Sequence, residues 1–128
     1  MMGGNDWATH VPLGSYNYGD YIPNSTALDF KPAYALMLTR IKDTYPYATV
    51  VCINEPLLLY ESIGDNNEFV FEDYMQAQID IAKMFNCQVV DLYHICGTLV
   101  HDNLATYTSD QMVHLNATGH TLIANIIK

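Results

Sequence analysis

Basic side chains are scarce in this sequence, which has 5 lysines and arginines against 14 aspartates and glutamates among 128 residues. Such an acidic surface repels the phosphates of nucleic acids and the headgroups of anionic lipids. Long apolar runs are also lacking, because acids, amides or prolines interrupt each one before the roughly 20 residues that a membrane-spanning helix needs. We therefore expect no nucleic-acid partner and no membrane span.

The first residues lack the basic and apolar regions of a secretory signal peptide. Cysteine is also sparse, and three residues, Cys52, Cys87 and Cys96, cannot all pair within one chain. Two of them lie in or beside apolar stretches, where free cysteine commonly acts as a small buried hydrophobic residue. We expect buried thiols and favour a reducing compartment such as the cytoplasm.

Apolar residues at helical spacing predict three helices. The first lies within 28–45 and ends at Pro46, the second begins at Phe71 and ends near residue 86, and the third follows Asn116, which is an expected N-cap. The segment 57–68 is expected to be a loop with at most a short helical turn. Another loop, rich in polar residues, is expected between 93 and 115.

Two short apolar runs, 48–53 and 88–92, predict strands covered on both faces, as in a parallel sheet. Helices alternate with these strands, which predicts a three-layer α/β/α architecture in one domain over residues 1–128. Two strands make a poor sheet by themselves. We therefore expect further strands before Met1, or strands supplied by a second chain in a homo-oligomer.

Two segments have residues suited to acyl-transfer chemistry. In Gly3-Gly4-Asn5-Asp6-Trp7 the glycines let the backbone turn sharply and present the Asn5 amide, the kind of donor that an oxyanion hole uses. Near the other end, Asp110 precedes His114, and a carboxylate in that place can hold an imidazole as a general base. Taken alone, the first segment is better explained by an ordinary Asx turn, and the second is equally consistent with a loop histidine beside a turn aspartate.

Together the two segments resemble the SGNH hydrolases, the family of GDSL-like lipases and esterases. The Gly4-Asn5-Asp6 run matches the family's Gly-x-Asn-Asp block, and 109–120 is similar to its Asp-x-x-His block and the helix that follows. The resemblance implies a flavodoxin-like α/β fold in which Asn5 donates to the oxyanion, His114 accepts the serine proton and Asp110 orients His114. It also implies a small ester substrate and no metal or organic cofactor.

Two departures from the family pattern stand out. Asp110 lies four residues before His114, where the family spacing is three and Gln111 stands here. A one-residue bulge would restore the pairing, or another acceptor would orient the ring. The family's Gly-Asp-Ser block and its second, glycine-containing block are missing, and Ser15 lacks the strand-to-helix turn that exposes a nucleophile.

Other polar and aromatic residues are weaker candidates. His94 and Cys96 match no standard zinc spacing, so we expect no metal site, and His120 is expected on the exposed side of the last helix. Trp7 and Tyr16, with two neighbouring tyrosines, are predicted either to line a substrate mouth or to pack the loop onto the sheet.

The prediction from sequence is thus an ester hydrolase, with carbohydrate or lipid deacetylation as the expected kind of reaction. The serine of its acyl-enzyme lies outside this chain, so we expect the chain alone to be inactive. The alternative is a non-catalytic α/β binding or assembly module of the same fold, which completes its sheet through a partner.

Overall fold

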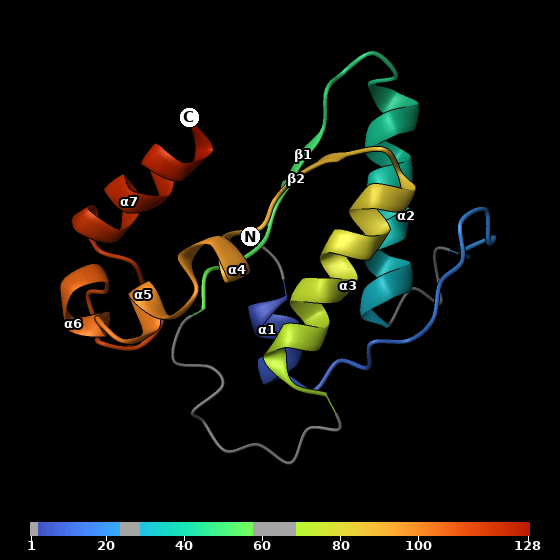
Figure 1. Cartoon of the computed structure of the whole chain (residues 1–128). Coiled ribbons are helices and arrows are strands. Elements are labelled where there is room, and N and C mark those ends of the chain that lie inside the picture. The colour runs from blue at the N-terminus through green and yellow to red at the C-terminus, as the bar shows by residue number, and fades with distance from the viewer. Residues whose placement is uncertain (1–2, 24–28, 58–68) are drawn as a thin grey trace.

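The computed structural model describes residues 3–23, 29–57 and 69–128. A parallel pair of strands, β1 (Val51–Ile53) and β2 (Gln88–Val90), lies between two groups of helices. Two long helices, α2 (Phe30–Thr44) and α3 (Phe71–Met84), lie on one side of the strands, and α7 (Ala117–Ile127) lies on the other (Figure 1). The predicted three-layer α/β/α arrangement with a parallel sheet is confirmed.

Alternation along the strands produces the layers, because successive side chains of a strand point to opposite faces. Cys52 and Val89 face α2 and α3, where they pack with Leu38 and Ile81 among others. Ile53 and Val90 face the opposite way, into a second cluster with Ile123 of α7 and its neighbours. The strands are shorter than predicted, and Val51 is half exposed.

The long helices begin and end as their sequences dictate. The first two free N–H groups at the start of α2, those of Phe30 and Lys31, donate to the carbonyl oxygens of Pro12 and Leu13. The helix ends at Thr44, two residues before Pro46, which cannot continue it. Buried residues of α3 pack against α2 and β1, so the α2–α3 pair forms the larger part of the core.

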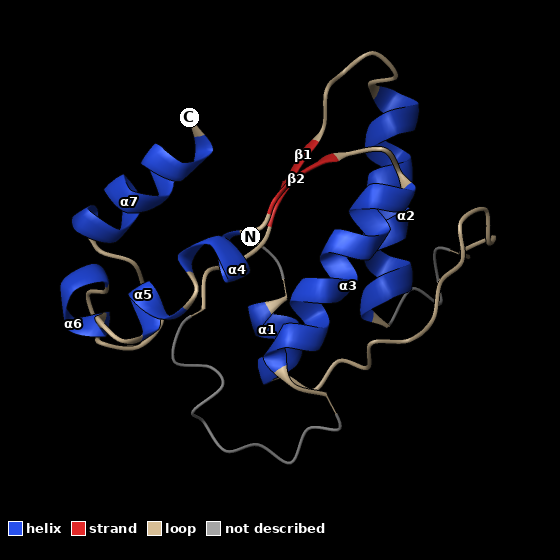
Figure 2. Ribbon diagram, in the orientation of Figure 1, coloured by secondary structure: helices blue, strands red, loops and turns tan. Residues whose placement is uncertain are grey.

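The predicted loop between residues 93 and 115 is wrong in part, because this segment folds into three short helices (Figure 2). They are α4 (Leu92–Cys96), α5 (Thr98–His101) and α6 (Leu104–Tyr107). Each is about one turn long and presents an apolar side chain such as Leu92, Val100 or Leu104 to the cluster around α7. The other predicted loop, 57–68, lies almost wholly outside the described residues.

None of the helices in the described part of the chain is long and apolar enough to cross a membrane.

Candidate functional site

The carboxyl ends of β1 and β2 meet in a buried polar contact. Asn54, which follows β1, is 2% exposed and donates from its side-chain amide to Asp91 Oδ1 at 2.7 Å. Its amide oxygen accepts the backbone N–H of Tyr93 at 3.1 Å. Ligands of open parallel sheets bind beyond the carboxyl ends of the strands, so this contact lies where a site is expected.

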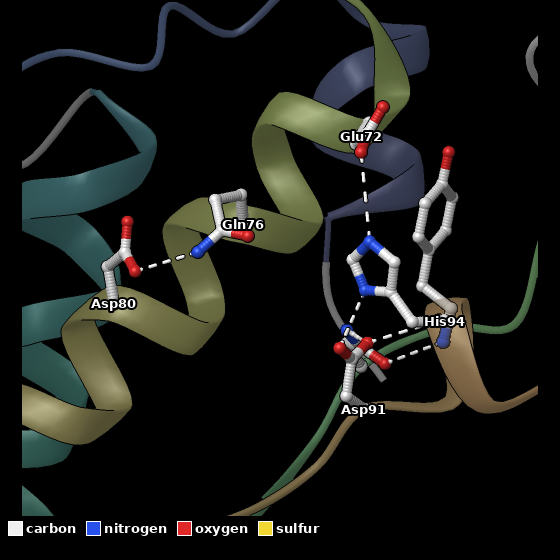
Figure 3. Close-up of polar contacts among 7 residues, drawn as sticks. Glu72, Gln76, Asp80, Asp91 and His94 are labelled. Atoms are coloured by element: carbon white, nitrogen blue, oxygen red, sulfur yellow. Dashed lines mark hydrogen bonds and ion pairs between the residues drawn. The ribbon is translucent and has the colours of Figure 1, made fainter.

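Asp91 also holds His94 through its carboxylate (Figure 3). The distance from Asp91 Oδ2 to His94 Nδ1 is 2.6 Å, and His94 Nε2 lies 3.7 Å from Glu72 Oε1 on α3. Burial alone would raise the pKa of Asp91, but hydrogen bonds from Asn54 and His94 outweigh it and lower the pKa. Asp91 therefore stays a carboxylate that links the strand ends to α4.

The helix α1 (Gly4–Ala8) lies beside the carboxyl end of β1. Its Gly4 N–H donates to Glu55 Oε1 at 3.2 Å, and burial raises the pKa of the Glu55 carboxyl although this hydrogen bond opposes the shift. Gly3 has φ 114°, and a Cβ there would lie 2.6 Å from Met75 Cε. Asn5 is exposed in the first turn of α1, consistent with the sharp turn predicted from the glycines.

Trp7 lies on the buried face of α1. Its ring is 4% exposed and packs edge-on against Phe71, while its Nε1 donates to the Phe69 carbonyl at 3.2 Å. Tyr16 instead stacks on Phe85, at the far end of α3. The two aromatic residues predicted to line one substrate mouth therefore lie apart, with Trp7 in the core.

Asp110 and His114 form another histidine–carboxylate pair, in the loop before α7. Asp110 Oδ2 and His114 Nδ1 are 2.5 Å apart. The other carboxylate oxygen, Oδ1, accepts the backbone N–H groups of Met112, Val113 and His114 at 2.9, 3.0 and 3.2 Å. The hydrogen bond with His114 and these backbone donors lower the pKa of Asp110, so it is ionised at neutral pH.

The four-residue spacing between these two residues is accommodated by the shape of their loop. Gln111 has φ 56°, a left-handed conformation that turns the backbone sharply. Thr108 and Leu115 form an antiparallel bridge across the base, and Ser109 N donates to His114 O at 2.7 Å. The extra residue is thus absorbed at the tip, and Asp110 still reaches Nδ1.

Asn116 fixes this loop to α7. Its side-chain oxygen accepts the N–H groups of Thr118 and Gly119 at 2.9 and 3.0 Å, which confirms the predicted N-cap. Its amide donates to the carbonyl oxygens of Thr106 and Thr108 at 2.9 and 3.1 Å. The side chain of His114 remains 78% exposed, so its Nε2 edge is open to a second group.

A family model described as GDSL-like Lipase/Acylhydrolase matches residues 1–114. The match covers the first predicted segment and the second one as far as His114. The chain belongs to this family. The resemblance to SGNH hydrolases inferred from the sequence is therefore confirmed. Comparison with curated proteins found no significant match.

Solved structures show the same fold for this GDSL-like chain. A crystal structure of a protein from Lactobacillus plantarum has a TM-score of 0.79 at 23% identity, over 98% of this chain and 61% of that one. A second crystal structure has a TM-score of 0.77 at 20% identity, over 98% and 58%. The chain thus spans about three fifths of the length of these two structures.

The structure brings Asp110 and His114 together, but among the described contacts none joins Asn5 to either of them. It also shows a contact that the sequence analysis missed, between Asn54 and Asp91. Asp91 in turn pairs with His94, which the sequence analysis considered only as a metal ligand. A signal for Asn54 was present, because it directly follows the predicted strand 48–53. Asp91 lies near the end of the predicted strand 88–92, and the carboxyl ends of parallel strands lie side by side.

The cysteines and histidines give no metal centre in the part of the chain that is described. All three cysteines are free thiols, with Cys52 and Cys96 buried and Cys87 partly so. His120 lies on the exposed face of α7, as predicted.

Proposed function

We propose that this chain supplies the histidine base and the oxyanion-hole donor of a serine ester hydrolase. In this proposal, His114 Nε2 accepts the proton of a serine that lies outside the chain. Asp110 holds the imidazole with its proton on Nδ1 and stabilises the imidazolium that forms. The Asn5 amide donates to the oxygen that becomes negative in the tetrahedral intermediate.

The observation that supports this most strongly is the Asp110–His114 pair. A general base needs one ring nitrogen fixed and the other free. Here Nδ1 is held at 2.5 Å and the histidine side chain is 78% exposed. Because three backbone N–H groups also hold the carboxylate, the pair is oriented before any substrate arrives.

The His94–Asp91 pair is the rival candidate, since it lies at the carboxyl ends of the strands. Its Nδ1 is held at 2.6 Å, but Nε2 faces Glu72 at 3.7 Å. A base whose second nitrogen faces a carboxylate is less free to receive a serine proton. We therefore assign catalysis to His114 and a structural role to His94.

The experiment is p-nitrophenyl acetate hydrolysis by the chain extended with the residues encoded directly upstream in the same reading frame. We expect turnover in the extended protein and a loss of at least about a thousandfold on His114→Ala. His101→Ala is the matched control, because His101 also contacts a neighbouring carboxylate, Asp102 at 3.2 Å. Turnover that survives His114→Ala but not His94→Ala would transfer the assignment to His94.

The non-catalytic assembly module remains the alternative. It predicts a stable dimer of this chain by light scattering and no hydrolysis by the extended protein. In the described part of the chain β1 and β2 pair only with each other, so each has an open edge to which a partner strand can add. A monomeric, active extended protein would exclude this alternative.

A further inference from the structure

A hollow of about 590 Å³ lies between the 16–22 segment, α2 and Phe85, the residue that follows α3. Its apolar lining comes from Tyr16, Tyr18, Tyr21, Ile22, Leu36 and Phe85. The volume is within the range of pockets that hold small ligands, roughly 300–1,000 Å³. His114, Asp110 and Asn5, the residues to which we assign ester hydrolysis, do not contribute to it.

Phe85 holds the aromatic rings of the hollow in place. It is 8% exposed and belongs to the core, and Tyr16 stacks on it with ring centroids 6.2 Å apart and planes at 19°. Tyr18 meets the same ring edge-on at 5.5 Å. Tyr18 and Tyr21 remain 68% and 88% exposed. Tyr16 and Tyr18 therefore form an open aromatic platform fixed by a core residue, and Tyr21 lines the same hollow.

Polar groups of mixed charge surround this platform. Asp20 closes its own turn by accepting the Asn17 N–H at 2.8 Å, and the last turns of α2 contribute Thr39, Lys42 and Asp43. Carboxylates accept hydrogen bonds, the lysine donates them, and a hydroxyl does both. An acyl chain has no group that can hydrogen-bond with these side chains, and a phosphate would face two carboxylates against one lysine.

A sugar ring satisfies both features, because its C–H face packs on an aromatic ring while its hydroxyl groups donate to carboxylates and accept from an ammonium. A quaternary ammonium ligand would favour rings that enclose it, whereas Tyr18 and Tyr21 are open to solvent. We propose that this hollow is a carbohydrate-binding site that takes a neutral pyranose ring.

The site lies well away from α1. Trp7 of α1 packs against Phe71 at the start of α3, and Phe85 follows the end of the same helix. A helix of 14 residues is about 20 Å long at 1.5 Å per residue. The hollow is therefore a separate binding site, and its test does not depend on the proposed esterase activity.

The test is an NMR titration of the ¹⁵N-labelled chain with cellotetraose and xylotetraose, with choline and inorganic phosphate as competing probes. We expect saturable shifts of the backbone signals of residues 16–22 and 85 with at least one of the sugars. Tyr21→Ala and Tyr18→Ala should each weaken binding by at least about tenfold, or 1.4 kcal/mol. Both side chains are largely exposed, so the variants should fold as the parent does.

Tyr47→Ala is the matched control, because Tyr47 is 100% exposed and lies outside the lining of the hollow. It should leave sugar binding unchanged. Asp43→Asn should weaken binding of the sugars and leave the chain folded. Stronger binding of choline or phosphate, sugar binding unaffected by Tyr21→Ala, or no shift by either sugar at millimolar concentration would overturn the proposal.

Discussion

Asn54 is the residue whose replacement tests the structure of the strand ends most directly. In Asn54→Ala the hydrogen bond to the Asp91 carboxylate disappears, which costs about 1.5–3 kcal/mol. The buried N–H of Tyr93 loses its acceptor as well, at a further cost of about 1–3 kcal/mol. We expect the free energy of unfolding to fall by about 4 kcal/mol, a large part of the roughly 5–15 kcal/mol that a domain has.

A second variant, Asn54→Asp, separates the two contacts. The new carboxylate still accepts the backbone N–H of Tyr93. The Asn54 amide nitrogen, which donates to Asp91 Oδ1 at 2.7 Å, is replaced by a second carboxylate oxygen. Two carboxylates that share a site raise one of their pKa values strongly. The folded state then retains a proton that the unfolded chain releases above about pH 4. The stability of this variant should therefore fall as the pH rises, and approach that of the parent in acid.

Urea unfolding, followed by far-UV circular dichroism at several pH values, measures both effects. Asn125, exposed on α7, supplies the matched controls, and Asn125→Ala and Asn125→Asp should each change stability by less than about 1 kcal/mol. The reasoning is refuted if Asn54→Ala unfolds at the urea concentration of the parent. A pH profile of Asn54→Asp parallel to that of the parent would equally contradict it.

Two further predictions concern packing and titration. Burial raises the pKa of Glu55, so its ionisation destabilises the fold once the pH rises above the pKa that Glu55 has in the unfolded chain. Glu55→Gln keeps an acceptor for the Gly4 N–H and should therefore raise Tm at pH 7 but not at pH 4. An equal gain at both pH values would argue against this cause. Gly119→Ala adds a Cβ 2.3 Å from the Tyr107 carbonyl oxygen. This clash should outweigh the higher helix propensity of alanine and lower the free energy of unfolding, measured in urea, by about 2 kcal/mol. A gain in stability would show instead that α6 and α7 separate easily.

The spacing of apolar residues was sufficient to predict the long helices. The apolar spacing of α2, α3 and α7 repeats over several turns, so their extents follow from the sequence to within a few residues. The short helices α4, α5 and α6 were not predicted, because a single turn is too short for apolar residues to repeat at helical spacing. They form because Leu92, Val100 and Leu104 find apolar partners around α7.

The candidate site divides in the same way. Asp110 and His114 are close in sequence, and the resemblance to the family suggested their pairing although their spacing departs from the family pattern. The left-handed backbone of Gln111 decided that a four-residue spacing closes the pair as well as a three-residue one. The contact of Asn54 with Asp91 joins residues 37 positions apart, and it exists because parallel strands bring their carboxyl ends together. Local chemistry and periodicity are written in the sequence, whereas contacts between distant residues depend on strand register and helix packing, which only the tertiary structure determines.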